Sequence, residues 1–260
     1  LKIQSSQRLL TIGQALRLNT SVEEINEITK YDNWFINQLK TIVEIERLIE
    51  DNDLTKELIL LAKHNGFTDK KIAKIRNISE KEIRKFRHNN NIRPIFRLVD
   101  TCAGEFSSKT PYLYSSYDWN FHNKPFCESN PTSNKKVLIL GGGPNRIGQG
   151  IEFDYCCVHA VYALKEKGIE TIMINWNPET VSTDYDTSDR LYFEPLIEEY
   201  VHNIILKEKS NGNLLGIIAQ FGGQTPIKLA KFLYENSLPI LGTQYTSIDL
   251  AEDRDRFRNL

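Results

Sequence analysis

The sequence lacks any long apolar run, and this absence sets the first limit on the class of protein. No stretch approaches the roughly 18 apolar residues that a membrane-spanning helix requires. The N-terminus also lacks the short apolar core behind a basic patch that marks a secretory signal peptide. The sequence therefore predicts no membrane partner and no secretion.

Cysteine is scarce, with 4 in 260 residues and no CxxC pair. Cys156 and Cys157 are adjacent in an apolar stretch, which is typical of small buried hydrophobic side chains. No His and Cys residues have the spacing of metal ligands, so we predict no metal site. This cysteine usage fits a reducing, cytoplasmic compartment.

An excess of charge of either sign is also absent, because the formal net charge is −1 with 26% charged residues. The chain as a whole therefore has neither the basic character of a nucleic-acid-binding protein nor that of a membrane-surface protein. At roughly 100–200 residues per domain, two domains are expected. The chain starts with Leu1 rather than Met and stops inside a helical pattern, so we expect a piece of a longer protein.

The first third of the chain has the apolar spacing of helices throughout residues 1–94. N-cap patterns at Ser21, Thr68 and Ser79 predict where three of these helices begin. Residues 95–136 look irregular although they are rich in aromatic side chains. We interpret them as a long ordered linker, and we expect the helical domain with its linker to cover residues 1–128.

From residue 137 onward, short apolar runs alternate with helical patterns. Such alternation predicts a parallel sheet with helices on both faces, a Rossmann-like α/β domain over residues 137–260. We expect the final helix to be capped by Asp249, with Glu252 three residues later. The predicted strands cover residues 137–140, 171–175, 190–193, 215–220 and 240–242.

Glycines cluster after two of these strands, where a parallel sheet faces its ligands. A strand, a glycine-rich turn and a helix can present backbone N–H groups to an anion. However, Arg146 stands where a dinucleotide fingerprint needs its third glycine, and no Gly-Lys-Ser/Thr of a P-loop is present. The chemistry leaves open an anion-binding turn or glycines that serve close packing. The glycines are Gly141, Gly142, Gly143, Gly148, Gly222 and Gly223.

Four longer strings are more specific than these spacings: GGGPNRIGQGIEFDYCC at 141–157, NPETVSTDYDTSDRLYFEP at 177–195, FGGQTP at 221–226 and AEDR at 251–254. Together they resemble the second synthetase half of carbamoyl-phosphate synthetase large subunits, in the bacterial or plastid form. VDTCAGEF at 99–106 resembles the family's linker, although Gly104 stands where alanine is expected. The resemblance extends over roughly residues 20–260.

The resemblance implies an ATP-dependent ligase that makes carbamoyl phosphate from bicarbonate, glutamine-derived ammonia and two ATP, for pyrimidine and arginine synthesis. A glutaminase small subunit would be its partner. The helical part would be an oligomerization domain and would support self-association. Residues 137–260 would be the pre-ATP-grasp domain of the half that phosphorylates carbamate. The compartment would be the cytoplasm, or the plastid in a plant or alga.

The family's ATP-grasp lobe, which binds ATP with Mg²⁺ or Mn²⁺, would lie mainly outside these residues. We therefore assign no catalytic residue and no metal ligand, and we predict that the chain alone is inactive. The resemblance assigns Gly150, Glu152 and Glu179 to the internal passage that carries carbamate. Alternatively, the two glutamates are ordinary loop or helix-cap carboxylates.

Two further patterns suggest other functions. Asp184, Asp186 and Asp189 are clustered, and we interpret them as turn residues that bond backbone rather than as metal ligands. Residues 63–97 hold 11 basic and 3 acidic residues, a net charge of +8, in a pattern that resembles a helix-turn-helix. A nucleic-acid-binding module is therefore the alternative, although the remaining −9 of the chain offers internal partners.

Overall fold

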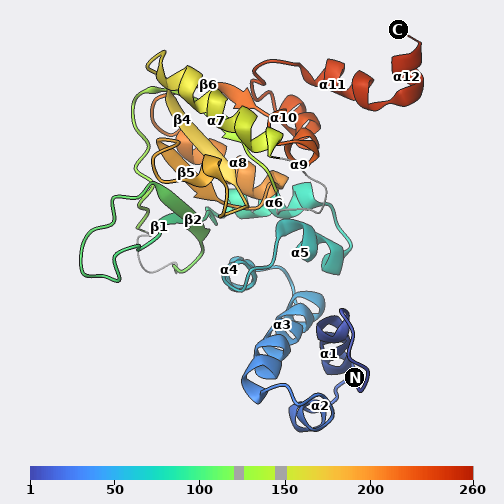
Figure 1. Cartoon of the computed structure of the whole chain (residues 1–260). Helices are drawn as coiled ribbons and strands as arrows, with labels where there is room; N and C mark the ends of the chain where they lie inside the picture. Colours follow the sequence, from blue (N-terminus) through green and yellow to red (C-terminus); the bar gives the residue numbers. More distant parts are fainter. Residues whose placement is uncertain (120–125, 144–150, 260) are drawn as a thin grey trace. The chain divides into compact units, whose positions relative to one another are not determined.

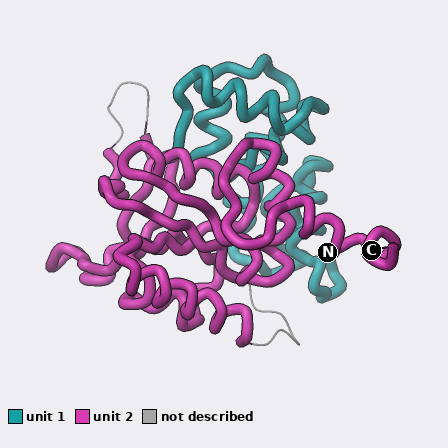
Figure 2. The backbone as a smooth tube through the Cα atoms, turned by 90° about the horizontal axis from the view of Figure 1, so that it is seen from above, with its two compact units in different colours: residues 1–93 teal, residues 94–260 magenta. Residues whose placement is uncertain are grey.

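The chain forms two compact units, residues Leu1–Arg93 and Pro94–Leu260 (Figure 2). The computed structural model describes residues 1–119, 126–143 and 151–259. A helical unit precedes an α/β unit, which confirms the predicted fold class. The boundary at residues 93 and 94 separates two groups of residues that contact each other within the group. The predicted functional domains, residues 1–128 and 137–260, have other boundaries and stay a prediction.

The first unit is helical throughout, as its apolar spacing predicts. Ser21, Thr68 and Ser79 each occupy an N-cap position and accept a hydrogen bond from the backbone N–H three residues later. Ser79 and Glu82 complete a reciprocal capping box. The helices are α1 (Arg8–Arg17), α2 (Val22–Thr29), α3 (Asn33–Asp51), α4 (Lys56–His64), α5 (Asp69–Arg76) and α6 (Glu80–Asn89) (Figure 1).

A buried ionic group joins α4, α5 and α6. The carboxylate of Asp69 accepts hydrogen bonds of 2.8 and 2.7 Å from Arg87 and one of 3.3 Å from Lys63. Burial acts to raise the pKa of Asp69, but the hydrogen bonds and charges of Arg87 and Lys63 outweigh it and lower the pKa. Removing either cation would leave a buried charge without full compensation.

The second unit is built on a sheet in the strand order β1-β2-β5-β4-β3-β6 (Figure 1). β1 and β2 are antiparallel, and every other neighbouring pair is parallel, which confirms the predicted parallel sheet. The strands are β1 (Ile95–Leu98), β2 (Tyr112–Ser116), β3 (Lys135–Leu140), β4 (Glu170–Asn175), β5 (Arg190–Phe193) and β6 (Asn213–Ile218). The helical segments are α7 (Glu152–Lys165), the 3₁₀ turn η1 (Val181–Thr183), α8 (Glu198–Glu208), α9 (Gln224–Ile227), α10 (Ala230–Glu235), α11 (Tyr245–Glu252) and α12 (Arg254–Arg258).

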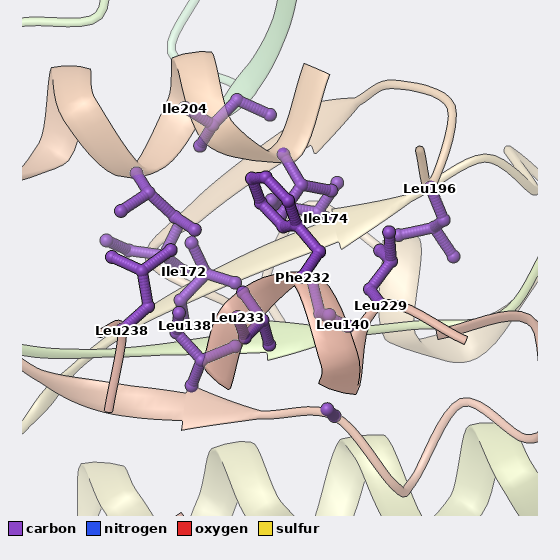
Figure 3. Packing of buried hydrophobic residues seen from close by; sticks show 14 of the residues in the cluster. Leu138, Leu140, Ile172, Ile174, Leu196, Ile204, Leu229, Phe232, Leu233 and Leu238 are labelled. Carbon is purple, nitrogen blue, oxygen red and sulfur yellow. The ribbon is translucent and has the colours of Figure 1, made fainter. Parts of the chain in front are cut away.

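Helices cover both faces of the sheet because side chains along each strand alternate between the faces. On one face, Leu138 and Ile172 pack in a single cluster with Ile204 of α8 and Phe232 of α10 (Figure 3). On the other face, β3, β4 and β5 pack against α7. Cys157 of α7 is buried there as predicted, whereas Cys156 is exposed, since successive helix residues point in different directions.

Residues 95–136 contribute two strands that the sequence did not predict. β1 pairs with β2, and β2 pairs in parallel with β5, so this segment extends the sheet. The strands have 4 and 5 residues, and the parallel partner of β2 is β5, which lies far along the chain. Such short strands leave little local pattern, because what stabilises them is pairing and packing rather than propensity.

Two predictions at the C-terminal end are wrong. The strand predicted at 240–242 is reduced to one parallel bridge, between Ile217 and Ile240, because the chain turns at Gly242 with φ +82°. Asp249 lies inside α11 rather than at a helix start. The last helix is instead capped by Asp253, which accepts hydrogen bonds from the N–H groups of Asp255 and Arg256.

Candidate functional site

The carboxyl ends of β3, β4 and β6 meet at one edge of the sheet, next to the start of α7. We call this the strand-tip edge and define it as residues 141–143, 151–154, 175–183 and 219–225. Parallel α/β sheets bind their ligands at this edge. The described glycines of the predicted set all lie within these residues.

Gly141 and Gly222 allow the loops at this edge to approach closely. A Cβ atom at Gly222 would overlap the carbonyl oxygen of Gly141 and would stand 2.7 Å from that of Leu140. A Cβ atom at Gly141 would stand 2.7 Å from Nδ2 of Asn175. Both contacts are shorter than real carbon contacts, so these two glycines serve close packing.

The remaining glycines of the predicted set have other surroundings. A Cβ atom at Gly143 would stand 3.1 Å from Oγ1 of Thr225, and Gly223 has φ +78°. A Cβ atom at Gly142 would meet nothing within 4 Å, so no described neighbour requires glycine there. Gly148 and Gly150 lie outside the described residues.

The two predicted passage carboxylates lie on different elements of the strand-tip edge. Glu152 is the first residue of α7, and its side chain is exposed. Glu179 is exposed in the turn after β4, where its N–H donates to Oδ1 of Asn177 at 3.0 Å. That they line a passage for carbamate stays a prediction.

The sequence analysis missed a buried polar group at the strand-tip edge. Asn175 is fully buried at the end of β4, and its Nδ2 donates to Oγ of Ser182 at 3.1 Å. The N–H of Ser182 donates in turn to Oδ2 of Asp154 at 3.1 Å. The available sequence signal was the pair Asn175 and Asn177 directly after a strand, a pattern typical of Asx turns.

Glu194, which follows β5, is a second buried polar residue that the sequence did not single out. Burial raises the pKa of its carboxyl group to about 7, and nearby Glu199 acts in the same direction. A hydrogen bond from the N–H of Ser115 opposes this shift, because it stabilises the ionised form. The carboxyl group therefore titrates near neutral pH.

The described residues offer no donor set for a metal ion that would accompany ATP. No group of three or more His, Cys, Asp or Glu side chains in this part of the chain is arranged to hold one. Oδ2 of Asp189 accepts hydrogen bonds of 2.8 Å from both N and Oγ1 of Thr171 in β4. We therefore assign no chemical step to these side chains.

The basic segment 63–97 uses much of its charge inside the first unit. Arg76 donates to three backbone carbonyls, those of Ile49, Glu50 and Asn52. Other cations of the segment form ion pairs with Asp69, Glu80 and Glu46; they are Lys63, Lys71, Arg84 and Arg87. This geometry favours a role in folding over contact with nucleic-acid phosphates.

None of the described helices combines the length and the apolar character needed to cross a bilayer.

Comparison with known proteins agrees with both units. Residues 133–250 match the family model of the carbamoyl phosphate synthase preATP-grasp domain, and residues 1–91 match that of the carbamoyl-phosphate synthetase large chain oligomerisation domain. Carbamoyl phosphate synthase large chains from Rhizobium meliloti and Neisseria meningitidis serogroup B are 54% and 51% identical over 97% and 98% of this chain. The large chain of Pseudomonas aeruginosa is 48% identical over 100% of this chain.

The chain spans only 22–24% of the length of these relatives. Within that span, two domain models match in the chain order of a helical unit followed by an α/β unit, and about half of the residues are identical. The chain belongs to the carbamoyl-phosphate synthetase large-chain family.

Proposed function

We propose that this chain is part of an ATP-dependent ligase that makes carbamoyl phosphate from bicarbonate, ammonia and two ATP. The observation that carries this proposal is the succession of an oligomerisation domain and a preATP-grasp domain, with about half of the residues identical to synthetase large chains. One ATP would activate bicarbonate, ammonia would then give carbamate, and the second ATP would phosphorylate carbamate. The product would supply pyrimidine and arginine synthesis.

The strand-tip edge would act as a wall of the passage that carries carbamate to the second phosphorylation. Carbamate decomposes in water, so it must travel sheltered. Glu152 and Glu179 are exposed at this edge, where carboxylates can hydrogen-bond a passing carbamic acid. Gly150, by resemblance, would keep the passage wide because it has no side chain.

ATP and Mg²⁺ or Mn²⁺ would bind mainly to an ATP-grasp lobe outside these residues. Phosphoryl transfer depends on cationic and metal groups that stabilise the phosphates. The described residues provide no metal-binding cluster of their own. The contribution of this chain would therefore be to scaffold the carbamate-phosphorylating half.

Two protein partners fit this proposal. A glutaminase small subunit would supply ammonia, and the assembly would work in the cytoplasm or in a plastid. A second copy would bind the first unit, where a groove of about 570 Å³ is lined mainly by apolar atoms. Leu9 and Phe35 line this groove together and are 51% and 57% exposed. Contiguous exposed apolar side chains are typical of surfaces that bind other proteins.

The proposal is tested by comparing the chain alone with a chimera. In the chimera, residues 1–260 replace the corresponding segment of the Rhizobium meliloti large chain, and the small subunit is added. We expect glutamine-dependent carbamoyl phosphate from the chimera and none from the chain alone. Product from the chain alone would contradict the assigned role, and a folded chimera without synthesis would contradict the function.

A further inference from the structure

A hydrogen-bonded link joins the two segments that carry the exposed glutamates. Asp154 lies in the first turn of α7, two residues after Glu152. Ser182 lies in η1, three residues after Glu179. The N–H of Ser182 donates to Oδ2 of Asp154 at 3.1 Å, so the start of α7 is tied directly to the segment that follows β4.

Asn175 anchors this link to the sheet. Its Nδ2 donates to Oγ of Ser182 at 3.1 Å, and its Oδ1 accepts the N–H of Asn177 at 2.9 Å. Oδ1 of Asn177 accepts the N–H of Glu179 at 3.0 Å. The side chain of Asn175 also lies against Gly141, where a Cβ atom would stand 2.7 Å from its Nδ2. A continuous set of contacts therefore runs from the buried end of β4 to the backbone of Glu179.

We propose that Asp154 and Asn175 are positioning residues. They would hold the segments that carry Glu152 and Glu179 at a fixed separation, so that both carboxylates can meet the passing carbamate. The inference rests on the proposed passage function. Both glutamate side chains are exposed, so packing does not fix where they stand. Two carboxylates that act on one small molecule need a fixed separation, and this must come from buried groups behind them. The link through Ser182 supplies that fixed separation.

The test separates the hydrogen bond of Asp154 from its charge. A negative charge in the first turn of α7 also stabilises the helix through its dipole. Asp154→Asn removes the charge but keeps a side-chain oxygen that can accept the N–H of Ser182. Asp154→Ala removes both, so the difference between the two variants reports the hydrogen bond.

The first measurement is hydrogen–deuterium exchange of the 260-residue chain. Losing one hydrogen bond changes a local equilibrium by roughly two- to tenfold. We expect Asp154→Ala to speed exchange by roughly that factor over residues 176–183, and Asp154→Asn to stay close to wild type. Equal exchange in the two variants would overturn the positioning role.

The second measurement is the yield of carbamoyl phosphate per ATP hydrolysed, in the chimeric large chain with its small subunit. We expect Asp154→Ala to lower this yield roughly two- to tenfold, and Asp154→Asn to restore it. Bicarbonate-dependent ATP hydrolysis and ATP formation from ADP and carbamoyl phosphate should stay unchanged, because neither needs carbamate to travel. Loss of all three activities together would indicate a merely structural role and would overturn the inference.

The variants Glu152→Gln and Glu179→Gln test the proposed passage separately from the positioning role of Asp154. If both lower the yield per ATP and Asp154→Ala does not, the passage stands and the positioning role falls. If neither lowers the yield, the proposed passage itself fails, whatever the exchange measurement shows.

Discussion

Two buried carboxyl groups show opposite pKa shifts because their partners differ. Asp69 receives hydrogen bonds from the cations Arg87 and Lys63, and its pKa is lowered despite burial. Glu194 receives one backbone N–H, from Ser115, and burial raises its pKa to about 7. At a buried position, the charge of the partner therefore decides whether a carboxyl group ionises. Neither environment can be read from the sequence near these residues.

The raised pKa of Glu194 predicts that this residue makes stability depend on pH. Between pH 4.5, the ordinary value, and about 7, the unfolded chain loses the proton while the folded chain keeps it. The unfolded state then binds fewer protons, so the free energy of unfolding falls as pH rises through this window. The full effect of a shift of this size is about 3 kcal/mol.

Glu194→Gln should remove this dependence, since glutamine keeps an oxygen for the N–H of Ser115 and has no proton to lose. We expect its stability relative to wild type to rise by up to about 3 kcal/mol between pH 4.5 and pH 8. Urea unfolding, monitored by hydrogen exchange of β5 and its neighbouring strands, measures the difference in the free energy of unfolding between variant and wild type. Glu166→Gln, at an exposed position of the same unit, is the control. A pH-independent difference for Glu194→Gln would contradict the prediction.

At the scale of elements, the sequence predicted those helices and strands that have a regular apolar pattern or a recognisable N-cap. The short apolar runs of β3 and β4 and the N-caps Ser21, Thr68 and Ser79 are local patterns, and the structure confirms them. β1 and β2 were missed because pairing with distant partners, rather than their own composition, makes them strands.

At the candidate site, too, features that form a local sequence pattern were predicted, and features that depend on long-range contacts were not. The glycines that mark the strand-tip edge stand in long motifs and were found from the sequence. The link between Asp154, Asn175 and Ser182 was not found, because a hydrogen bond across 28 residues depends on the folded geometry.

Gly222 sets how closely the ends of β3 and β6 approach each other. A methyl group there would overlap the carbonyl oxygen of Gly141, and both partners are backbone that cannot move aside. We expect Gly222→Ala to lower the free energy of unfolding of the second unit by about 3 kcal/mol, as overpacking does. Gly142→Ala is the matched control, because its added carbon meets nothing within 4 Å. Equal losses for both variants, measured by urea unfolding, would show that the close approach is not the cause.

At the scale of the whole molecule, each unit presents a surface that its own fold does not cover. The strand-tip edge of the second unit exposes Trp176 as well as the two glutamates. The first unit exposes Trp34 and Phe35 beside its apolar groove. Exposed aromatic side chains of this size are typical of surfaces that bind other proteins. The family match to an oligomerisation domain makes a second copy the proposed partner of the first unit.

If the chain self-associates through this groove, its apparent mass in solution should rise with protein concentration. A single charged substitution in the groove should weaken this association. Leu9→Glu or Phe35→Glu would bury a carboxylate in the apolar interface, and we expect the dissociation constant of the assembly to rise at least roughly tenfold. Sedimentation velocity of the 260-residue chain over a range of concentrations measures it. Leu61→Glu is the control, because Leu61 is also exposed but lies on α4 and does not line the groove. The groove is not the interface if wild type stays monomeric, or if Leu61→Glu weakens association as much as Phe35→Glu.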